Sequence, residues 1–256
     1  MCRLLGWASS EPTTLAQLLG EKDLQGFLGL WRKHGDGWGV ARSAGSTVEV
    51  VKESGSAACS AGFAALAHEQ ASDLALVHLR WATLGLPVAH HNAHPFTNGR
   101  LAFGHNGSVD PPAALDALLD DHARELRRGD TDSERLFLAL LSRLGDGHDD
   151  AGRALVEAVR TVWALRPAVH CGSLNSMLLT PSRLFALCSY DPLAQAREDE
   201  PDYYRLRFRS TPTSVVVAST GWGDGWTDLR NGQLLSVDRV GLEVRIIDLE
   251  GVPTGD

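Results

Sequence analysis

The sequence contains few features that would cross-link the chain, direct it to a membrane or hold a structural metal. It has four cysteines in 256 residues, at Cys2, Cys59, Cys171 and Cys188, and none stand in a C-x-x-C spacing. The last three lie among apolar residues and are predicted to be small buried side chains. The N-terminus lacks the basic start and long apolar core of a signal peptide, and no apolar run could span a bilayer. We therefore expect a cytoplasmic protein with no membrane partner.

Positive charge is also scarce. The chain has 24 Lys and Arg against 32 Asp and Glu, which gives a formal net charge of −8. No basic run with interleaved aromatic residues occurs, so a nucleic-acid partner is not expected. The length is ample for burying a core. Because no repeat or long linker divides the chain, we expect a single domain over residues 1–256.

The apolar pattern predicts an α+β fold. Strands are expected in two groups with helices between them, which favours antiparallel sheets with helices packed outside. The strand over residues 74–82 is apolar on both faces, as in a sheet covered on both sides. The expected strands span residues 2–8, 38–43, 47–53, 74–82, 100–105, 173–180, 183–189, 214–220, 233–238 and 242–247. The expected helices span residues 57–70, 132–144 and 151–163.

Cys2 is the first residue that could carry chemistry. Met1 is normally removed when the next side chain is small, which would leave Cys2 with a free α-amine. That amine has a reference pKa of about 7.7–8.0, so it can accept the thiol proton near neutral pH. One residue would then supply both nucleophile and base. By itself, Cys2 is better explained as a chance residue at the start of a buried strand.

Arg80 lies near the end of the most apolar predicted strand, on the same face as Leu76 and His78. A buried guanidinium is costly unless it is paired, and its planar fork suits a carboxylate. That carboxylate can belong to a substrate or to a structural salt bridge.

Two further motifs favour structural interpretations. The stretch from His91 to Phe96 contains a second histidine, His94, but no acidic or thiol ligand follows nearby, so a turn scaffold ending at Pro95 is favoured over a metal site. The glycine-rich turn over residues 34–39 lacks the Lys and Ser/Thr of a phosphate loop. Its glycines are expected to allow tight backbone packing. We expect neither a metal nor a cofactor.

Asn106 and Gly107 follow a predicted strand. An Asn side-chain amide and the next backbone N–H can converge on one oxygen, as in an oxyanion hole. Taken alone, the pair is better explained as an ordinary Asn-Gly turn in which the strand ends.

Asp132 follows Thr131, and Glu134 completes the pattern of a capping box. An acid in the first helical turn is favoured by the helix dipole. A functional alternative is that the Asp132 carboxylate receives the α-ammonium of an amino acid.

The order of these motifs is more specific than any one of them. Met-Cys is followed by Asp-Gly-Trp-Gly, His-Leu-Arg-Trp-Ala-Thr, Asn-Ala-His-Pro-Phe, His-Asn-Gly and Thr-Asp-Ser-Glu. This series, from Cys2 to about Glu134, resembles the class II glutamine amidotransferases. The later part, with Gly225-Trp226, is similar to the small stand-alone branch that includes ergothioneine-pathway γ-glutamyl hydrolases.

The resemblance implies a four-layer α/β/β/α sandwich of two antiparallel sheets, the N-terminal-nucleophile hydrolase fold. It also implies that Cys2 is the nucleophile and that its amine is the base. Asn106 and Gly107 would form the oxyanion hole. The substrate would be a small γ-glutamyl compound, either glutamine or a γ-glutamyl conjugate.

The resemblance further assigns substrate contacts. Arg80 would bind the glutamyl α-carboxylate and Asp132 the α-ammonium, while Trp81 and Thr83 would line the pocket. One position departs from the glucosamine-6-phosphate synthase branch, where a His commonly follows the Arg-Trp-Ala-Thr motif. Leu84 stands there in this sequence, which favours the stand-alone branch.

Three functions are compatible with these motifs. The first is a stand-alone hydrolase of a γ-glutamyl amide. The second is a glutaminase subunit that delivers ammonia to a separate synthase partner, because a chain ending at Asp256 leaves no room for a synthase domain. The third is a non-catalytic γ-glutamyl-binding module. The motifs name neither the leaving amine nor an oligomeric state.

Overall fold

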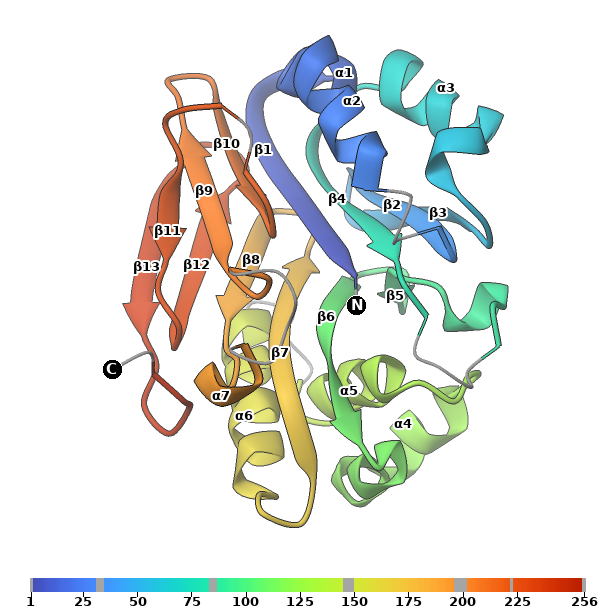
Figure 1. The fold of residues 1–256 in the computed structure, drawn as a ribbon, viewed down its shortest axis with the longest axis vertical. Helices are drawn as coiled ribbons and strands as arrows, with labels where there is room; N and C mark the ends of the chain where they lie inside the picture. Colours follow the sequence, from blue (N-terminus) through green and yellow to red (C-terminus); the bar gives the residue numbers. More distant parts are fainter. Residues whose placement is uncertain are drawn as a thin grey trace.

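Two antiparallel sheets stacked face to face form the centre of the molecule, and helices cover their outer faces (Figure 1). The computed structural model describes residues 2–30, 35–82, 87–144, 150–195, 202–221 and 223–254. One apolar cluster fills the space between the sheets, and two others fill the spaces between each sheet and its helices. The predicted α+β sandwich with four layers is confirmed.

The first sheet has seven strands, and β1 and β4 lie near its middle. β4 is buried along almost its whole length, as its two apolar faces predicted. The strands expected over residues 38–43 and 47–53 correspond to β2 and β3, which form a hairpin in which Ala44 lies opposite Thr47. In spatial order the strands are β11 (Thr227–Leu229), β9 (Leu206–Ser210), β10 (Ser214–Ala218), β1 (Arg3–Thr13), β4 (Ser72–Arg80), β2 (Gly37–Ala44) and β3 (Thr47–Glu53).

The second sheet has six strands, and β6 and β7 form its most extensive pair. The prediction that a strand ends in a turn at Asn106-Gly107 is wrong, because β6 continues to Asp110. Gly107 serves close strand packing there, since a β carbon would overlap the Ser173 carbonyl of β7. In spatial order the strands are β13 (Val244–Asp248), β12 (Gln233–Asp238), β8 (Arg183–Cys188), β7 (His170–Leu179), β6 (Ala102–Asp110) and β5 (Phe96–Thr97).

The helices divide between the two sheets according to their position in the chain (Figure 1). Side chains from α1 (Leu15–Leu19), α2 (Glu21–Gly29) and α3 (Ala61–Glu69) pack on the first sheet. Side chains from α5 (Asp132–Leu141) and α6 (Ala151–Ala164) pack on the second. The remaining short elements are η2 (Ala57–Cys59), η3 (His90–Asn92), η4 (Pro112–Leu118), α4 (Asp121–Leu126) and α7 (Pro192–Gln195).

Two details of the helix predictions are corrected. The helix expected from residue 57 begins only at Ala61, because the Ser60 hydroxyl caps it by accepting the Phe63 N–H. Cys59 therefore lies in the turn before the helix and is exposed, whereas Cys171 and Cys188 are buried as predicted. The helix expected to reach residue 144 ends at Leu141.

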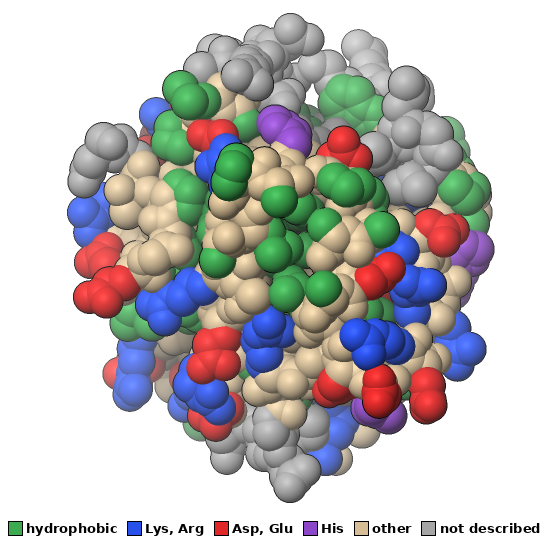
Figure 2. Space-filling model, turned by 90° about the horizontal axis from the view of Figure 1, so that it is seen from below, with side chains coloured by type: hydrophobic (Ala, Val, Ile, Leu, Met, Phe, Trp, Pro, Cys, Tyr) green, Lys and Arg blue, Asp and Glu red, His purple; other side chains and the backbone are tan. Residues whose placement is uncertain are grey.

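The surface agrees with the charge composition. Figure 2 shows basic and acidic side chains interspersed over one face, with no large area of a single sign. Of the helices in the described ranges, none has the length and apolarity to cross a membrane.

Candidate active site

The pairing of β1 with β4 brings two of the predicted site residues, Cys2 and Arg80, together. Arg3 lies opposite Leu79, so Cys2 lies next to Arg80 at the end of β4. The Cys2 thiol faces the Trp81 carbonyl, with 3.8 Å between Sγ and O. Cys2 is only 8% exposed. Burial raises the pKa of the Cys2 thiol, while the N-terminal charge and the Arg80 guanidinium oppose that shift.

Arg80 is the buried cation of this region. Its side chain is 3% exposed, and its Nη1 has no hydrogen-bond partner among the described residues. Burial lowers the pKa of Arg80, and the charges of Cys2 and Asp36 oppose the shift. A structural salt bridge, the alternative that the sequence left open, is not formed with any acid in the described part of the chain. Arg80 is therefore a charged group whose donor is available to a ligand.

Asp36 holds the end of β4 in place. Its carboxylate accepts the Ala82 N–H at 2.8 Å, and its own N–H donates to the Arg80 carbonyl at 3.1 Å. The predicted packing role of the neighbouring glycines is confirmed at Gly39, where a β carbon would overlap the His94 carbonyl. Asp36 was not among the predicted site residues, although a carboxylate directly before this glycine-rich strand was a signal for it.

Asn106 approaches the same place from the second sheet. Alternation along β6 puts it on the face of Gly104, which meets Leu4 of β1 and His78 of β4 across the interface. Cys2 shares the face of Leu4 by the same rule. The Asn106 side chain is fully buried, yet among the described residues neither its Oδ1 nor its Nδ2 has a hydrogen-bond partner. A buried amide in this state is costly and points to a missing ligand.

Asp132 joins the first turn of α5 to β6. One carboxylate oxygen accepts the Val109 N–H at 2.8 Å, and the Ser133 hydroxyl lies 3.5 Å from the other. The side chain is buried, and its charge acts on Cys2 and His105. Asp132 thus has a structural partner and also lies close enough to influence the thiol.

The predicted capping box is only half formed. The Thr131 hydroxyl accepts the Glu134 N–H at 3.1 Å, as expected. The Glu134 carboxylate accepts the N–H groups of Arg128 and Gly129 at 2.9 and 2.7 Å, instead of that of Thr131. The Glu134 carboxylate therefore caps the segment that precedes α5.

Trp81 and Thr83 are the remaining two residues that were predicted to line the pocket. The carbonyl of Trp81 faces the thiol, whereas the residue as a whole is 40% exposed. Thr83 lies outside the described residues.

Three buried histidines surround the site, and the sequence analysis gave none of them a functional role. The His94 ring stacks on that of His78, with 4.0 Å between centroids. Burial lowers the pKa of His94 well below its usual range, and His78 and His105 add to the shift. His105 donates from Nε2 to the Ser173 carbonyl at 3.1 Å, and its Nδ1 lies 2.9 Å from the Ser133 hydroxyl. Burial also lowers the pKa of His105, while the charge of Asp132 opposes that shift.

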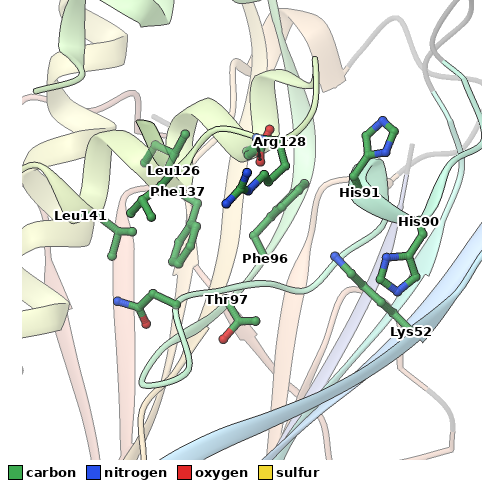
Figure 3. A pocket seen from close by; sticks show the side chains of 12 residues that line it. Lys52, His90, His91, Phe96, Thr97, Leu126, Arg128, Phe137 and Leu141 are labelled. Carbon is green, nitrogen blue, oxygen red and sulfur yellow. Dashed lines mark hydrogen bonds between the residues drawn. The ribbon is translucent and has the colours of Figure 1, made fainter. Parts of the chain in front are cut away.

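A cavity of about 370 Å³ lies beside the site. Figure 3 shows Phe96 and Phe137 lining it, with Lys52 towards one end. The Lys52 ammonium donates to the Ala93 carbonyl at 2.6 Å, and burial lowers the pKa of Lys52 to about 8. The His94 ring contacts Phe96, with 4.7 Å between centroids. Because none of the predicted site residues lines this cavity, it neighbours the site without being part of it.

Taken together, these elements place a thiol, a cation and an amide that has no partner in the described part of the chain in a buried space between two sheets. The family model "Glutamine amidotransferases class-II" matches residues 1–241. The chain belongs to that family. The resemblance inferred from the motif order is thereby confirmed, and the protein is an amide-hydrolysing enzyme of the class II amidotransferases.

Individual relatives of this amidotransferase cover either nearly the whole chain or a part of it. The gamma-glutamyl-hercynylcysteine sulfoxide hydrolase of Mycobacterium tuberculosis is 27% identical over 97% of both chains. The glutamine--fructose-6-phosphate aminotransferase of Brucella abortus is 41% identical over 83 residues, which are 32% of this chain and 12% of that protein.

A solved structure supports the same fold. The glutamine aminotransferase class-II domain protein of Silicibacter pomeroyi superimposes with a TM-score of 0.68 at 23% identity. The superposition covers 97% of this chain and 99% of that chain. The amidotransferase described here therefore has the N-terminal-nucleophile sandwich expected from its sequence.

Proposed function

We propose that this amidotransferase is a stand-alone hydrolase of a γ-glutamyl conjugate and that residues 1–256 form one catalytic domain. The observation that carries the proposal is the buried Asn106 amide, which has no partner for its donor or its acceptor among the described residues. The activity for which the mycobacterial relative is named, and which belongs to a chain that aligns over 97% of both lengths, supports a conjugate over free glutamine.

Asn106 and Gly107 are assigned to the oxyanion hole. Leaving a buried amide unsatisfied costs about 1–3 kcal/mol, which the fold tolerates when a ligand supplies the partner. An Asn106 Nδ2–H and the Gly107 N–H are donors of the kind that stabilise the tetrahedral intermediate of acyl transfer.

Arg80 and Asp132 are assigned to the two charged ends of the glutamyl group. The unpartnered Nη1 of Arg80 would donate to the α-carboxylate, and a charge-assisted bond in a buried site is strong. Asp132 would accept the α-ammonium while one of its oxygens stays bonded to Val109. Trp81 and Thr83 are assigned to the pocket wall.

The reaction starts once Met1 is removed and the α-amine of Cys2 is free. The amine takes the thiol proton, and Sγ attacks the γ-amide carbonyl carbon. The oxyanion collapses, the C–N bond breaks, and the ammonium gives its proton to the leaving amine. Water then attacks the thioester, which releases the γ-carboxylate of glutamate and restores the thiol.

The deciding experiment compares hydrolysis of free glutamine with hydrolysis of γ-glutamyl thiol conjugates by the same preparation. We expect a higher kcat/KM for a conjugate. Intact-mass measurement after exposure to a glutamine-analogue affinity label should show one adduct on Cys2. The absence of that adduct, together with the absence of turnover, would identify a binding module instead.

The local similarity to fructose-6-phosphate aminotransferase supports a second candidate, in which the chain delivers ammonia to a separate synthase. Glutamine hydrolysis that rises only when a partner protein is added would favour this candidate. Full hydrolysis of a conjugate by the isolated chain would exclude it.

A further inference from the structure

A second group of chemically active side chains meets at Cys2, and the proposed hydrolysis uses Cys2 but neither of the other two members. Potential ligand atoms from Cys2, His78 and His94 lie within 4.8 Å of one another, and all three residues are buried. His78 comes from β4, and His94 comes from the segment before β5. The three residues are separated in the sequence by 76 and 16 positions, so no local motif announces the group.

His94 is the least satisfied member of this group. Its side chain is 3% exposed, and among the described residues neither ring nitrogen has a hydrogen-bond partner. The ring is held in place by stacking on His78 on one side and by an edge contact with Phe96 on another. A buried imidazole that is fixed by packing but lacks polar partners is suited to receive a ligand.

His78 has the anchoring expected of a metal-binding histidine. Its Nε2 lies 3.3 Å from the His105 carbonyl, which can only accept, so the proton is on Nε2. The lone pair of the neutral ring is therefore on Nδ1. Histidine ligands usually donate their other N–H to a carbonyl in this way, which fixes the tautomer and the ring orientation.

We propose that Cys2, His78 and His94 bind one Zn²⁺ ion. The ion coordinates the Cys2 thiolate, so that the thiolate cannot attack substrate, and it thereby inhibits the enzyme reversibly. A thiolate and two imidazoles form a zinc donor set, and they exclude the oxygen-preferring Mg²⁺ and Ca²⁺. Zinc bonds of about 2.0–2.3 Å require the three ligand atoms to move closer by about 1 Å. The α-amine that Cys2 gains when Met1 is removed is a fourth donor, because it forms a five-membered chelate with Sγ. Inhibition rests on the proposed nucleophilic role of Cys2, whereas binding does not.

The first test measures binding directly on the full processed chain. Titration with Zn²⁺ by calorimetry should give one site, and Co²⁺ should produce the near-ultraviolet thiolate-to-metal absorption band. Half-inhibition of γ-glutamyl hydrolysis should occur at the same free Zn²⁺ concentration as half-saturation, and EDTA should restore turnover. Prior labelling of Cys2 with a glutamine-analogue affinity label should abolish the band without any substitution.

One variant tests His94 as a ligand, and a second variant serves as its control. His94→Gln should weaken Zn²⁺ binding at least about tenfold, since even outer contacts of a metal site contribute 10–100-fold. Cys59→Ser, at the exposed cysteine, should leave binding unchanged. No binding, or binding that survives both the Cys2 label and His94→Gln, would overturn the site and leave the hydrolase proposal intact. Binding at these ligands without inhibition would overturn both the inhibitory role and the role of Cys2.

Discussion

Two asparagines lie opposite each other on neighbouring strands, and they differ in whether their side-chain amides have hydrogen-bond partners. Asn106 of β6 lies opposite Asn175 of β7, and both side chains are fully buried. The Asn175 amide donates to the Tyr204 carbonyl and accepts the Ser189 N–H at 2.7 Å. The Asn106 amide has no partner on either atom among the described residues. The asparagine of β7 thus serves the structure, whereas the asparagine of β6 has hydrogen-bonding groups that a ligand can use.

Two buried arginines repeat this contrast. Arg3 donates to the carbonyls of Tyr203 and Ser219, and its guanidinium lies 4.3 Å from the Tyr203 ring centroid. Arg80 keeps Nη1 without a partner in the described part of the chain. A polar group that satisfies itself within the fold stabilises the fold, whereas one left unsatisfied is available for a ligand. The following predictions test this division.

Replacing the thiol should have the largest effect. Cys2→Ala should lower kcat by about 10⁴-fold or more, because no thioester can form. The matched control is Cys171→Ala, which removes another buried thiol and should retain turnover. Single-turnover assays with a γ-glutamyl conjugate measure both. Equal losses in the two variants would contradict the assignment of the nucleophile.

The two asparagines should separate activity from stability. Asn106→Ala should lower kcat by about 10²–10³-fold through loss of an oxyanion donor, and its free energy of unfolding should change by less than about 1 kcal/mol. Asn175→Ala should cost about 2–4 kcal/mol of stability, because it leaves the Tyr204 carbonyl and the Ser189 N–H unsatisfied. Urea unfolding and steady-state kinetics on both variants provide the comparison. Full activity of Asn106→Ala would remove the residue from the mechanism.

The two arginines should separate substrate affinity from stability. Arg80→Lys should raise KM by about 10–100-fold, because an ammonium cannot reproduce the planar fork that suits a carboxylate. Arg3→Lys should instead lower the free energy of unfolding by about 1 kcal/mol through loss of its carbonyl and ring contacts. An Arg80→Lys variant that loses stability while keeping its KM would place Arg80 among the structural residues.

The smallest expected effect is a pH dependence of stability from the buried histidines. Because the pKa of His94 and of His105 is lower in the folded protein than in the unfolded chain, the unfolded state binds more protons below about pH 6.5. The free energy of unfolding should therefore be full above that pH and fall as the pH drops, by at most about 1.4 kcal/mol per pH unit for each residue. Urea unfolding across pH 5 to 7 measures the slope.

Substitution tests the source of that slope. His94→Gln should reduce it, and His68→Gln, at an exposed position of α3, should leave it unchanged. An unchanged slope in His94→Gln would mean that His94 does not contribute.

Much of the fold was predictable because its signals are local. The hairpin of β2 and β3, the twice-buried β4 and the amphipathic α6 all follow from apolar periodicity and turn residues. Other elements were missed: α1, α2 and α4 are short helices, and β9 and β11 are short strands near the sheet edge. Such segments are determined by packing against neighbours more than by their own pattern.

The candidate site was predicted in composition but not in arrangement. The motif order identified Cys2, Arg80, Asn106 and Asp132 as a set. It misplaced Asn106 in a turn, because Asn-Gly is a frequent turn pair and only the close contact with β7 makes Gly107 a strand residue.

Residue identity and order are enough to establish the family, the α+β class and the types of group that meet at the site. The three-dimensional arrangement is needed to show which groups lack partners among the described residues and that His78 and His94 join Cys2. Hydrogen-bond satisfaction depends on every partner within reach of a buried atom. Those partners come from strands far apart in the chain, so their proximity is set by register and sheet stacking.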